Sequence, residues 1–275
     1  MPELPEVEVT RQALAPYVEG QTVQALVVRE RRLRWPVPVH LARVLKHHAV
    51  LRLDRRGKYL LWRFAHGTLI THQGMSGVWR VLEQATPAQK HDHVDVCLGQ
   101  VTLRYSDPRR FGAVLWHGAA AGDVEQHPLL AHLGMEPFDP RFNGAVLHAG
   151  TRGRKAPIKQ VLLAGDVVVG VGNIYASEAL FHAGIAPQRA AWRLSHAQCE
   201  RLAAAVRQVL AQAIALGGSS LRDFVGTDGE QGYFMVDAAV YGRAGLPCKQ
   251  CGTSVRRIVQ GQRASYYCPR CQKTN

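Results

Sequence analysis

The first residues of the chain can act as a nucleophile and an acid. Pro2 follows the initiator methionine and precedes Glu3. Proline is small enough for the methionine to be removed, which would leave a secondary amine at the new N-terminus. An α-amino pKa of about 7.7–8.0 leaves an appreciable neutral, nucleophilic fraction near pH 7. Attack on an electrophilic carbon would give a cationic iminium, which acts as an electron sink. Prolines also commonly begin a helix or an extended segment, so Pro2 alone leaves both interpretations open.

The second chemically telling group is a cysteine cluster near the other end of the chain. Its spacing is C-x2-C-x16-C-x2-C, formed by Cys248, Cys251, Cys268 and Cys271. Two close pairs of thiolates are typical of a tetrahedral zinc site, and the intervening segment suits a β-hairpin. Disulfides and an iron–sulfur cluster are the alternatives. The spacing therefore predicts one structural Zn²⁺. Cys97 and Cys199 stand apart and are expected to be buried thiols.

Charge indicates what the protein binds. The chain has 275 residues, a formal net charge of +13 and seven basic side chains without any acid after residue 240. Such a surface attracts polyanions, foremost nucleic acid and secondarily a membrane surface. No apolar run reaches the roughly 20 residues that span a bilayer, and the N-terminus lacks the features of a signal peptide. We therefore expect a cytoplasmic protein that has no membrane partner.

The elements that must position these residues change in type along the chain. Residues 3–15 have a helical pattern that Pro16 is expected to close. Short alternating segments then predict strands at 23–28, 50–53, 59–64, 68–72, 93–98, 101–105 and 111–116. This run of short strands favours an antiparallel sandwich or barrel. Residues 124–133 are a candidate short helix.

Helical periodicity dominates the second half. Ser195 and Gln198 form a capping box at the start of a helix that ends at Gly217. A glycine-bearing turn leads into a helix over 174–183, with Asn173 as its N-cap. Such a helix start also suits a phosphate.

A long polar segment over 219–234 is expected to form a loop that closes over a ligand. The expected domains are 1–133, a linker over 134–152, a helical domain over 153–240 and a zinc module over 241–275.

Several motifs occur in the order found in one family. They are Pro2–Glu6, Gly74–Gly77, Asp107–Gly112, Gly170–Glu178 and the terminal cysteines. The chain resembles the bacterial formamidopyrimidine-DNA glycosylases, which excise 8-oxoguanine and act as AP lyases, over essentially its whole length. The resemblance implies an α+β fold: an N-terminal antiparallel β-sandwich with an N-terminal helix, then a helix-two-turn-helix domain with a β-hairpin zinc finger.

The resemblance also implies roles for individual residues. Pro2 would attack C1′ of the damaged nucleotide and hold the sugar as a Schiff base through which both flanking phosphates are eliminated. Glu3 would be the acid, and Lys58 would approach the phosphate and lesion. Glu6 would either place the amine by a hydrogen bond or lie on the helix surface. The protein would act on damaged double-stranded DNA as a monomer with one structural zinc.

Further residues would hold the DNA. Met75, Arg109 and Phe111 would fill the void left by the extruded base. The flanking glycines and arginines favour exposed loop tips for Met75 and Phe111, whose types otherwise suit a core. Phosphates would be held by His72, His91, Asn173 and Arg263, and Lys155 would lie near the lesion.

Two other functions are compatible with parts of the sequence. An endonuclease VIII-like glycosylase would use the same proline on oxidised pyrimidines, but Leu4 and Phe111 depart from that group's pattern. A zinc-ribbon DNA-binding protein would explain the charge and the cysteines but gives Pro2 no role. Gln73 stands where the resembled family usually has leucine, and the individual sequence of 219–234 leaves the lesion preference open.

Overall fold

The computed structural model describes residues 2–84, 86–219 and 237–273. They fall into two compact units, the first from residues 2–131 with 217–219, the second from 132–216 with 237–273. The loop expected over 219–234 lies outside the described residues except for Ser219. No helix in the described ranges is long and apolar enough to cross a membrane.

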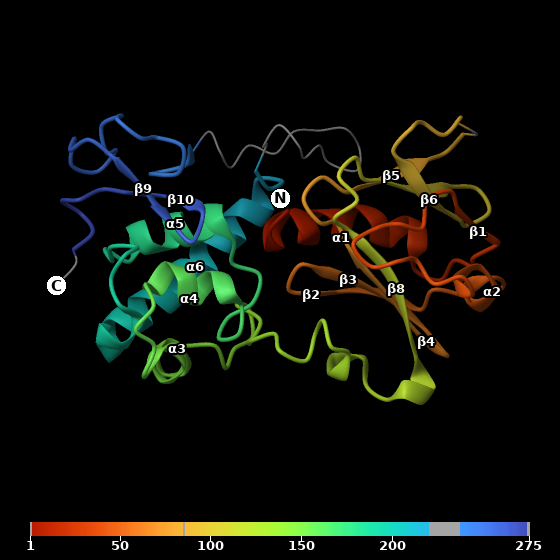
Figure 1. Cartoon of the computed structure of the whole chain (residues 1–275), viewed down its shortest axis with the longest axis horizontal. Helices are drawn as coiled ribbons and strands as arrows, with labels where there is room; N and C mark the ends of the chain where they lie inside the picture. Colours follow the sequence, from red (N-terminus) through yellow and green to blue (C-terminus); the bar gives the residue numbers. More distant parts are fainter. Residues whose placement is uncertain (1, 85, 220–236, 274–275) are drawn as a thin grey trace. The chain divides into compact units, whose positions relative to one another are not determined.

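The first unit contains two four-stranded antiparallel sheets (Figure 1). One sheet has the order β1-β6-β7-β5, formed by β1 (Ala25–Val28), β5 (Val78–Leu82), β6 (Asp92–Cys97) and β7 (Thr102–Ser106). The other has the order β2-β3-β4-β8, formed by β2 (Arg52–Arg56), β3 (Tyr59–Phe64), β4 (Gly67–His72) and β8 (Ala113–Gly118). The expected N-terminal antiparallel β-sandwich is therefore confirmed.

The core lies between these sheets because apolar side chains alternate along the strands. Trp62 of β3 and Trp79 of β5 are fully buried with ring centroids 5.3 Å apart, so the sheets meet face to face. Helix α1 (Leu4–Val18) adds one apolar face to this core, and α2 (Leu41–Leu45) is a short helix against it. Helix α1 continues through Pro16, contrary to expectation, because the burial of Val18 offsets the hydrogen bond that proline cannot donate.

The second unit is helical with a terminal hairpin. Its elements are α3 (Gly144–Thr151), α4 (Ile158–Ala164), α5 (Asn173–His182), α6 (His196–Ala215), β9 (Arg256–Gln260) and β10 (Arg263–Tyr267). Helix α6 begins with the predicted capping box, in which Gln198 N–H donates to Ser195 Oγ at 3.3 Å. The N-cap of α5 is Gly172 and not Asn173, which is the first helical residue. Helix α3 lies within the segment expected to be a linker.

Three other expectations differ from the structure. Residues 124–133 form only a 3₁₀ turn at Val124–Gln126, because Pro128 disfavours helical backbone at the preceding residue. Similar turns occur at Ala119–Ala121 and Ala191–Arg193. Strand β5 was not predicted. Cys199 is buried as expected, whereas Cys97 is half-buried at the end of β6.

Candidate active site and metal centre

The start of α1 is a closed hydrogen-bonded arrangement. Pro2 is buried, and so is Glu3, whose N–H donates to Glu6 Oε2 at 2.8 Å. The other oxygen of Glu6 accepts from both N–H and Oγ of Ser219, each at 2.8 Å. Glu6 therefore fixes the backbone beside Pro2 and also Ser219, where the predicted lesion loop begins. Because Glu6 is buried, it does not lie on the helix surface.

Lys58 and His72 are brought together by the pairing of β3 with β4. Lys58 lies in the turn before β3, and Tyr59, the next residue, pairs with His72. Burial lowers the pKa of His72 to about 4, helped by the positive charges of Lys58 and Arg34. The imidazole is therefore neutral at physiological pH. Its Nδ1 accepts from Gly74 N–H at 2.9 Å, which leaves the proton on Nε2 as an uncharged donor.

The loops after β4 and β7 carry the three residues expected to fill the base void. Met75 is half-buried, and Phe111 is 43% exposed. The guanidinium carbon of Arg109 lies 4.9 Å from the centroid of the Phe111 ring. The loops touch, because a Cβ on Gly74 would collide with the backbone of Phe111. The exposed aromatic ring is therefore part of a surface that two loops form together.

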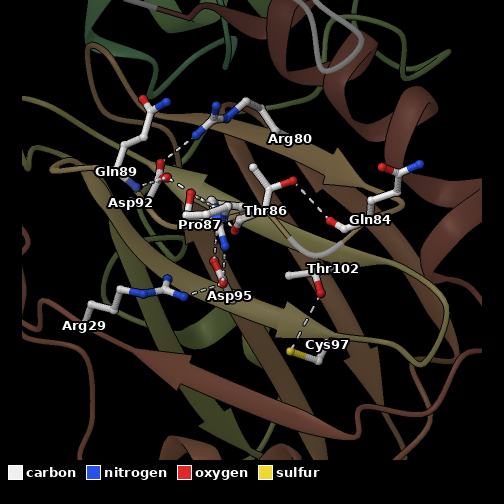
Figure 2. A network of polar contacts seen from close by, with 11 residues as sticks. Arg29, Arg80, Gln84, Thr86, Pro87, Gln89, Asp92, Asp95, Cys97 and Thr102 are labelled. Atoms are coloured by element: carbon white, nitrogen blue, oxygen red, sulfur yellow. Dashed lines mark hydrogen bonds and ion pairs between the residues drawn. The ribbon is translucent and has the colours of Figure 1, made fainter.

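His91 directly precedes β6. A network of hydrogen bonds and ion pairs joins Asp95 of β6 to the segment at Thr86 and Pro87, a few residues before His91 (Figure 2). Arg104 donates to the carbonyl oxygens of Thr86 and Pro87 at 2.9 and 3.1 Å, and to Asp95 at 2.9 Å. Burial raises the pKa of Asp95, but hydrogen bonds from Arg104 and Arg29 outweigh it and the net shift is downward. The paired charges make this network a rigid support for the segment before His91.

In the second unit, two side chains converge on the carbonyl oxygen of Ala264 at the base of the hairpin tip. Asn173 Nδ2 donates to it at 3.0 Å, and so does the Nζ of the buried Lys159, also at 3.0 Å. The neighbouring Arg263 is exposed at the start of β10. The side-chain amide of Asn173 therefore supports the hairpin.

Lys159 was not singled out from the sequence. The signal was a lysine directly after Ile158 at the start of an apolar helical pattern, where a cation needs a partner. Lys155, which was singled out, is exposed.

The four cysteines converge as predicted. Their Sγ atoms all lie within 4.8 Å of one another, with Cys251 and Cys268 at 3.5 Å and Cys248 and Cys271 at 4.0 Å. A tetrahedral zinc with Zn–S bonds of about 2.3 Å requires sulfur atoms about 3.8 Å apart, which these distances fit. Cys271 N–H also donates to Cys268 Sγ at 3.4 Å, a contact that stabilises thiolate. The donor set fits one structural Zn²⁺.

The β-sandwich begins with a buried proline–glutamate pair, and the helical unit ends in a four-cysteine hairpin. These features define a zinc-finger protein of two units. Family models match along the chain: the formamidopyrimidine-DNA glycosylase N-terminal domain over residues 1–114, its H2TH domain over 133–225, and the zinc finger found in FPG and IleRS over 245–274. The chain belongs to the formamidopyrimidine-DNA glycosylase family.

Individual relatives agree over the full length. Formamidopyrimidine-DNA glycosylase of Bordetella pertussis is 62% identical over 99% of this chain and 100% of its own. The crystal structure of the MutM (Fpg) protein from Thermus thermophilus is 40% identical, with a TM-score of 0.87 and coverage of 98% of both chains. A Lactococcus lactis Fpg variant in complex with Fapy-dG-containing DNA is 31% identical, with a TM-score of 0.91, over 99% of this chain and 100% of its own.

Proposed function

We propose that Pro2 carries the chemistry of this DNA glycosylase and AP lyase, which removes oxidised purines in base-excision repair. The observation that carries the proposal is the buried Pro2–Glu3 pair, fixed by Glu6, in a chain whose relatives include Fpg proteins bound to Fapy-dG and to an abasic site. The terminal-amine chemistry expected from the sequence requires this kind of enclosed, oriented nitrogen.

The steps follow from an iminium intermediate. The Pro2 nitrogen bonds to C1′ as the bond from C1′ to the damaged base breaks, and the base leaves with the electron pair and takes up a proton. Glu3 protonates the ring oxygen as the sugar opens, and loss of the amine proton leaves the cationic iminium. The resulting iminium withdraws electrons, so a proton leaves C2′ and the 3′ phosphate is expelled. A second elimination expels the 5′ phosphate, and water then releases the sugar fragment from Pro2. Lys58 places a positive charge at the phosphate and lesion.

We assign Met75, Arg109 and Phe111 to the space vacated by the extruded nucleotide. Their loop positions suit this role, because a thioether and an exposed aromatic ring can enter a base stack while a guanidinium can donate to the orphaned base. We assign His72 to a phosphate as an uncharged donor. We assign His91 to another phosphate, and the Arg104 network supports the segment that precedes it. In the second unit, we assign phosphate contact to Arg263 and to the backbone N–H of Asn173.

We also propose that the chain has four functional parts: a catalytic domain over 1–133, a linker over 134–152, a helical DNA-binding domain over 153–240 and a zinc module over 241–275. We also propose that the protein acts as a monomer in a reducing cytoplasm, since four thiolates hold zinc only while they remain reduced. Sedimentation with and without a lesion duplex tests the first statement.

Borohydride trapping tests the assignment of Pro2. The purified protein is incubated with duplexes that carry 8-oxoguanine or thymine glycol, borohydride is added, and the adduct is located by peptide mass spectrometry. We expect an adduct on Pro2 with the 8-oxoguanine duplex. Pro5→Ala, which changes the second proline of the same motif, should still be trapped.

Three outcomes would overturn parts of the proposal. Retention of the initiator methionine in an active protein, or strand cleavage that survives acylation of the N-terminal nitrogen, removes Pro2 as the nucleophile. Trapping with thymine glycol alone points to oxidised pyrimidines, an outcome that must be tested because one relative was crystallised with oxidised-pyrimidine DNA. Tight DNA binding without any adduct leaves a binding protein.

A further inference from the structure

Asp107 is a fully buried carboxylate whose four hydrogen-bond donors all belong to β7 or to the two loops that carry Met75, Arg109 and Phe111. Oδ1 accepts from Ser76 Oγ at 2.8 Å and from Arg109 N–H at 3.2 Å. Oδ2 accepts from Gly112 N–H at 2.8 Å and from Tyr105 Oη at 3.2 Å. One side chain thus bonds to the loop after β4, to the loop after β7, and to the strand between them.

The backbone of Asp107 is fixed as firmly as its side chain. Its carbonyl oxygen accepts from the buried His93 Nε2 at 2.8 Å, and its N–H donates to the carbonyl oxygen of His91 at 3.0 Å. Tyr105 Oη also lies 3.3 Å from the carbonyl oxygen of His72. We call Asp107, Tyr105, His93 and Ser76 the Asp107 hub. The hub contacts the backbone of three residues that we assign to DNA contact, His72, His91 and Arg109.

The glycines of the two loops are fitted to this hub. A Cβ at Gly77 or at Gly112 would collide with Tyr105 Oη, and a Cβ at Gly74 would collide with the backbone of the other loop. Tyr105 can therefore insert its hydroxyl between the loops only because both are glycine at the point of contact. These glycines belong to the motifs that surround Met75 and Phe111.

From this geometry we infer that Asp107 and Tyr105 are positioning residues that lock the two loops into one wedge, so that Met75, Arg109 and Phe111 enter the base stack together. This inference rests on the void-filling role proposed above. Insertion of side chains into a base stack is opposed by base stacking. If the two loops could move apart, this opposition would displace the loops and the bases would stay stacked. A buried carboxylate with four donors resists such separation, because each broken bond leaves an unsatisfied polar group.

The test separates extrusion from the chemistry that follows it. Excision of 8-oxoguanine requires the wedge, whereas cleavage at a preformed abasic site has no base to extrude. Asp107→Asn keeps the volume but turns an amide N–H₂ toward a donor, and Tyr105→Phe removes only the hydroxyl that lies between the glycines. We expect each variant to lower the single-turnover excision rate about tenfold or more and the abasic-site cleavage rate by less than about threefold. The fluorescence of a 2-aminopurine placed next to the lesion, which rises when the base stack opens, should also increase more slowly after the variant is mixed with the DNA.

Asp95→Asn is the matched control, because Asp95 is another buried aspartate, in the adjacent strand, whose partners are arginines and not the two loops. It is expected to cost stability and to change both rates by the same factor. A ratio of the two rates that is unchanged in Asp107→Asn and Tyr105→Phe overturns the hub's role, provided that Met75→Ala and Phe111→Ala lower excision. If those two leave excision intact, the void-filling assignment itself has failed.

Discussion

A single backbone N–H determines what His72 can do. Gly74 N–H donates to Nδ1, so the ring proton must be on Nε2, and burial with two nearby cations keeps the ring uncharged. A phosphate at this position would therefore meet a neutral donor, with the positive charge supplied by Lys58. The DNA contact that we propose for His72 would therefore be insensitive to pH in the range where an ordinary histidine titrates.

The low pKa of His72 also makes stability depend on pH. Between about pH 4 and 6.5 the unfolded chain takes up a proton on this residue and the folded chain does not, so the free energy of unfolding rises with pH. His72→Gln should flatten that rise by up to about 1.4 kcal/mol per pH unit. Urea unfolding at several pH values measures the free energy of unfolding, and NMR titration of the ring measures the pKa of His72. A ring that titrates near its ordinary value would contradict the prediction.

Residue type and spacing predicted the four-cysteine cluster, and the structure confirms it. The roles of Pro2 and Glu3 follow from type and order in the same way, and they stay predictions. Asp107 and Lys159 were missed, since their roles depend on backbone atoms such as the Ala264 carbonyl that only the fold brings near. An aspartate after a strand looks like an ordinary turn residue.

At the scale of elements, Gly74 shows how a loop depends on one backbone conformation. Its φ of +64° lies in the left-handed region, and a Cβ there would also strike the backbone of Phe111 and Gly112. Gly74→Ala should lower the free energy of unfolding by about 2–5 kcal/mol, the sum of the left-handed cost and the overlap. Because it forces the loops apart, it should also lower 8-oxoguanine excision more than abasic-site cleavage.

Gly122→Ala is the control for that variant. Gly122 has a φ of +91°, and a Cβ on it would have no atom within 4 Å. With a ψ of −157° its backbone lies in a region essentially restricted to glycine, so the substitution should cost a backbone penalty of about 1–3 kcal/mol and leave the ratio of the two rates unchanged. Denaturant unfolding and the two cleavage assays compare them directly. Equal losses in the two variants would mean that loop contact at Gly74 contributes nothing.

Elements with strong local signals were predicted, and those set by context were not. Helix α6 has a capping box and a long apolar stripe, and both are present. Strand β5 was missed because it pairs only with β7 and its apolar residues Val78 and Leu82 blur the alternation. The start of α5 was displaced by one residue, since a glycine and an asparagine are both acceptable N-caps.

At the scale of the whole molecule, the sequence predicted the type of partner but not which cations meet it. Lysine and arginine number 34 against 21 acidic residues, which indicates a polyanion. Many arginines are committed to carboxylates in the structure, as in the pairs Arg55–Glu8 and Arg104–Asp95. Net charge counts these together with the exposed arginines that can bind phosphate, and only the fold separates the two groups.

The salt dependence of DNA binding tests that separation. Arg263 is exposed at the tip of the zinc hairpin, and each phosphate neutralised contributes a slope of about 0.9 in log K against log salt. Arg263→Ala should flatten the slope by about that amount between roughly 50 and 200 mM salt, with zinc content unchanged.

The control, Arg141→Ala, removes the same charge from a side chain that is 78% exposed and paired with Asp139. It should weaken binding slightly with no change in slope, because no phosphate contact is lost. Equal flattening in both variants would show that the slope reports overall charge, and Arg263 would then lose its assignment to a particular phosphate.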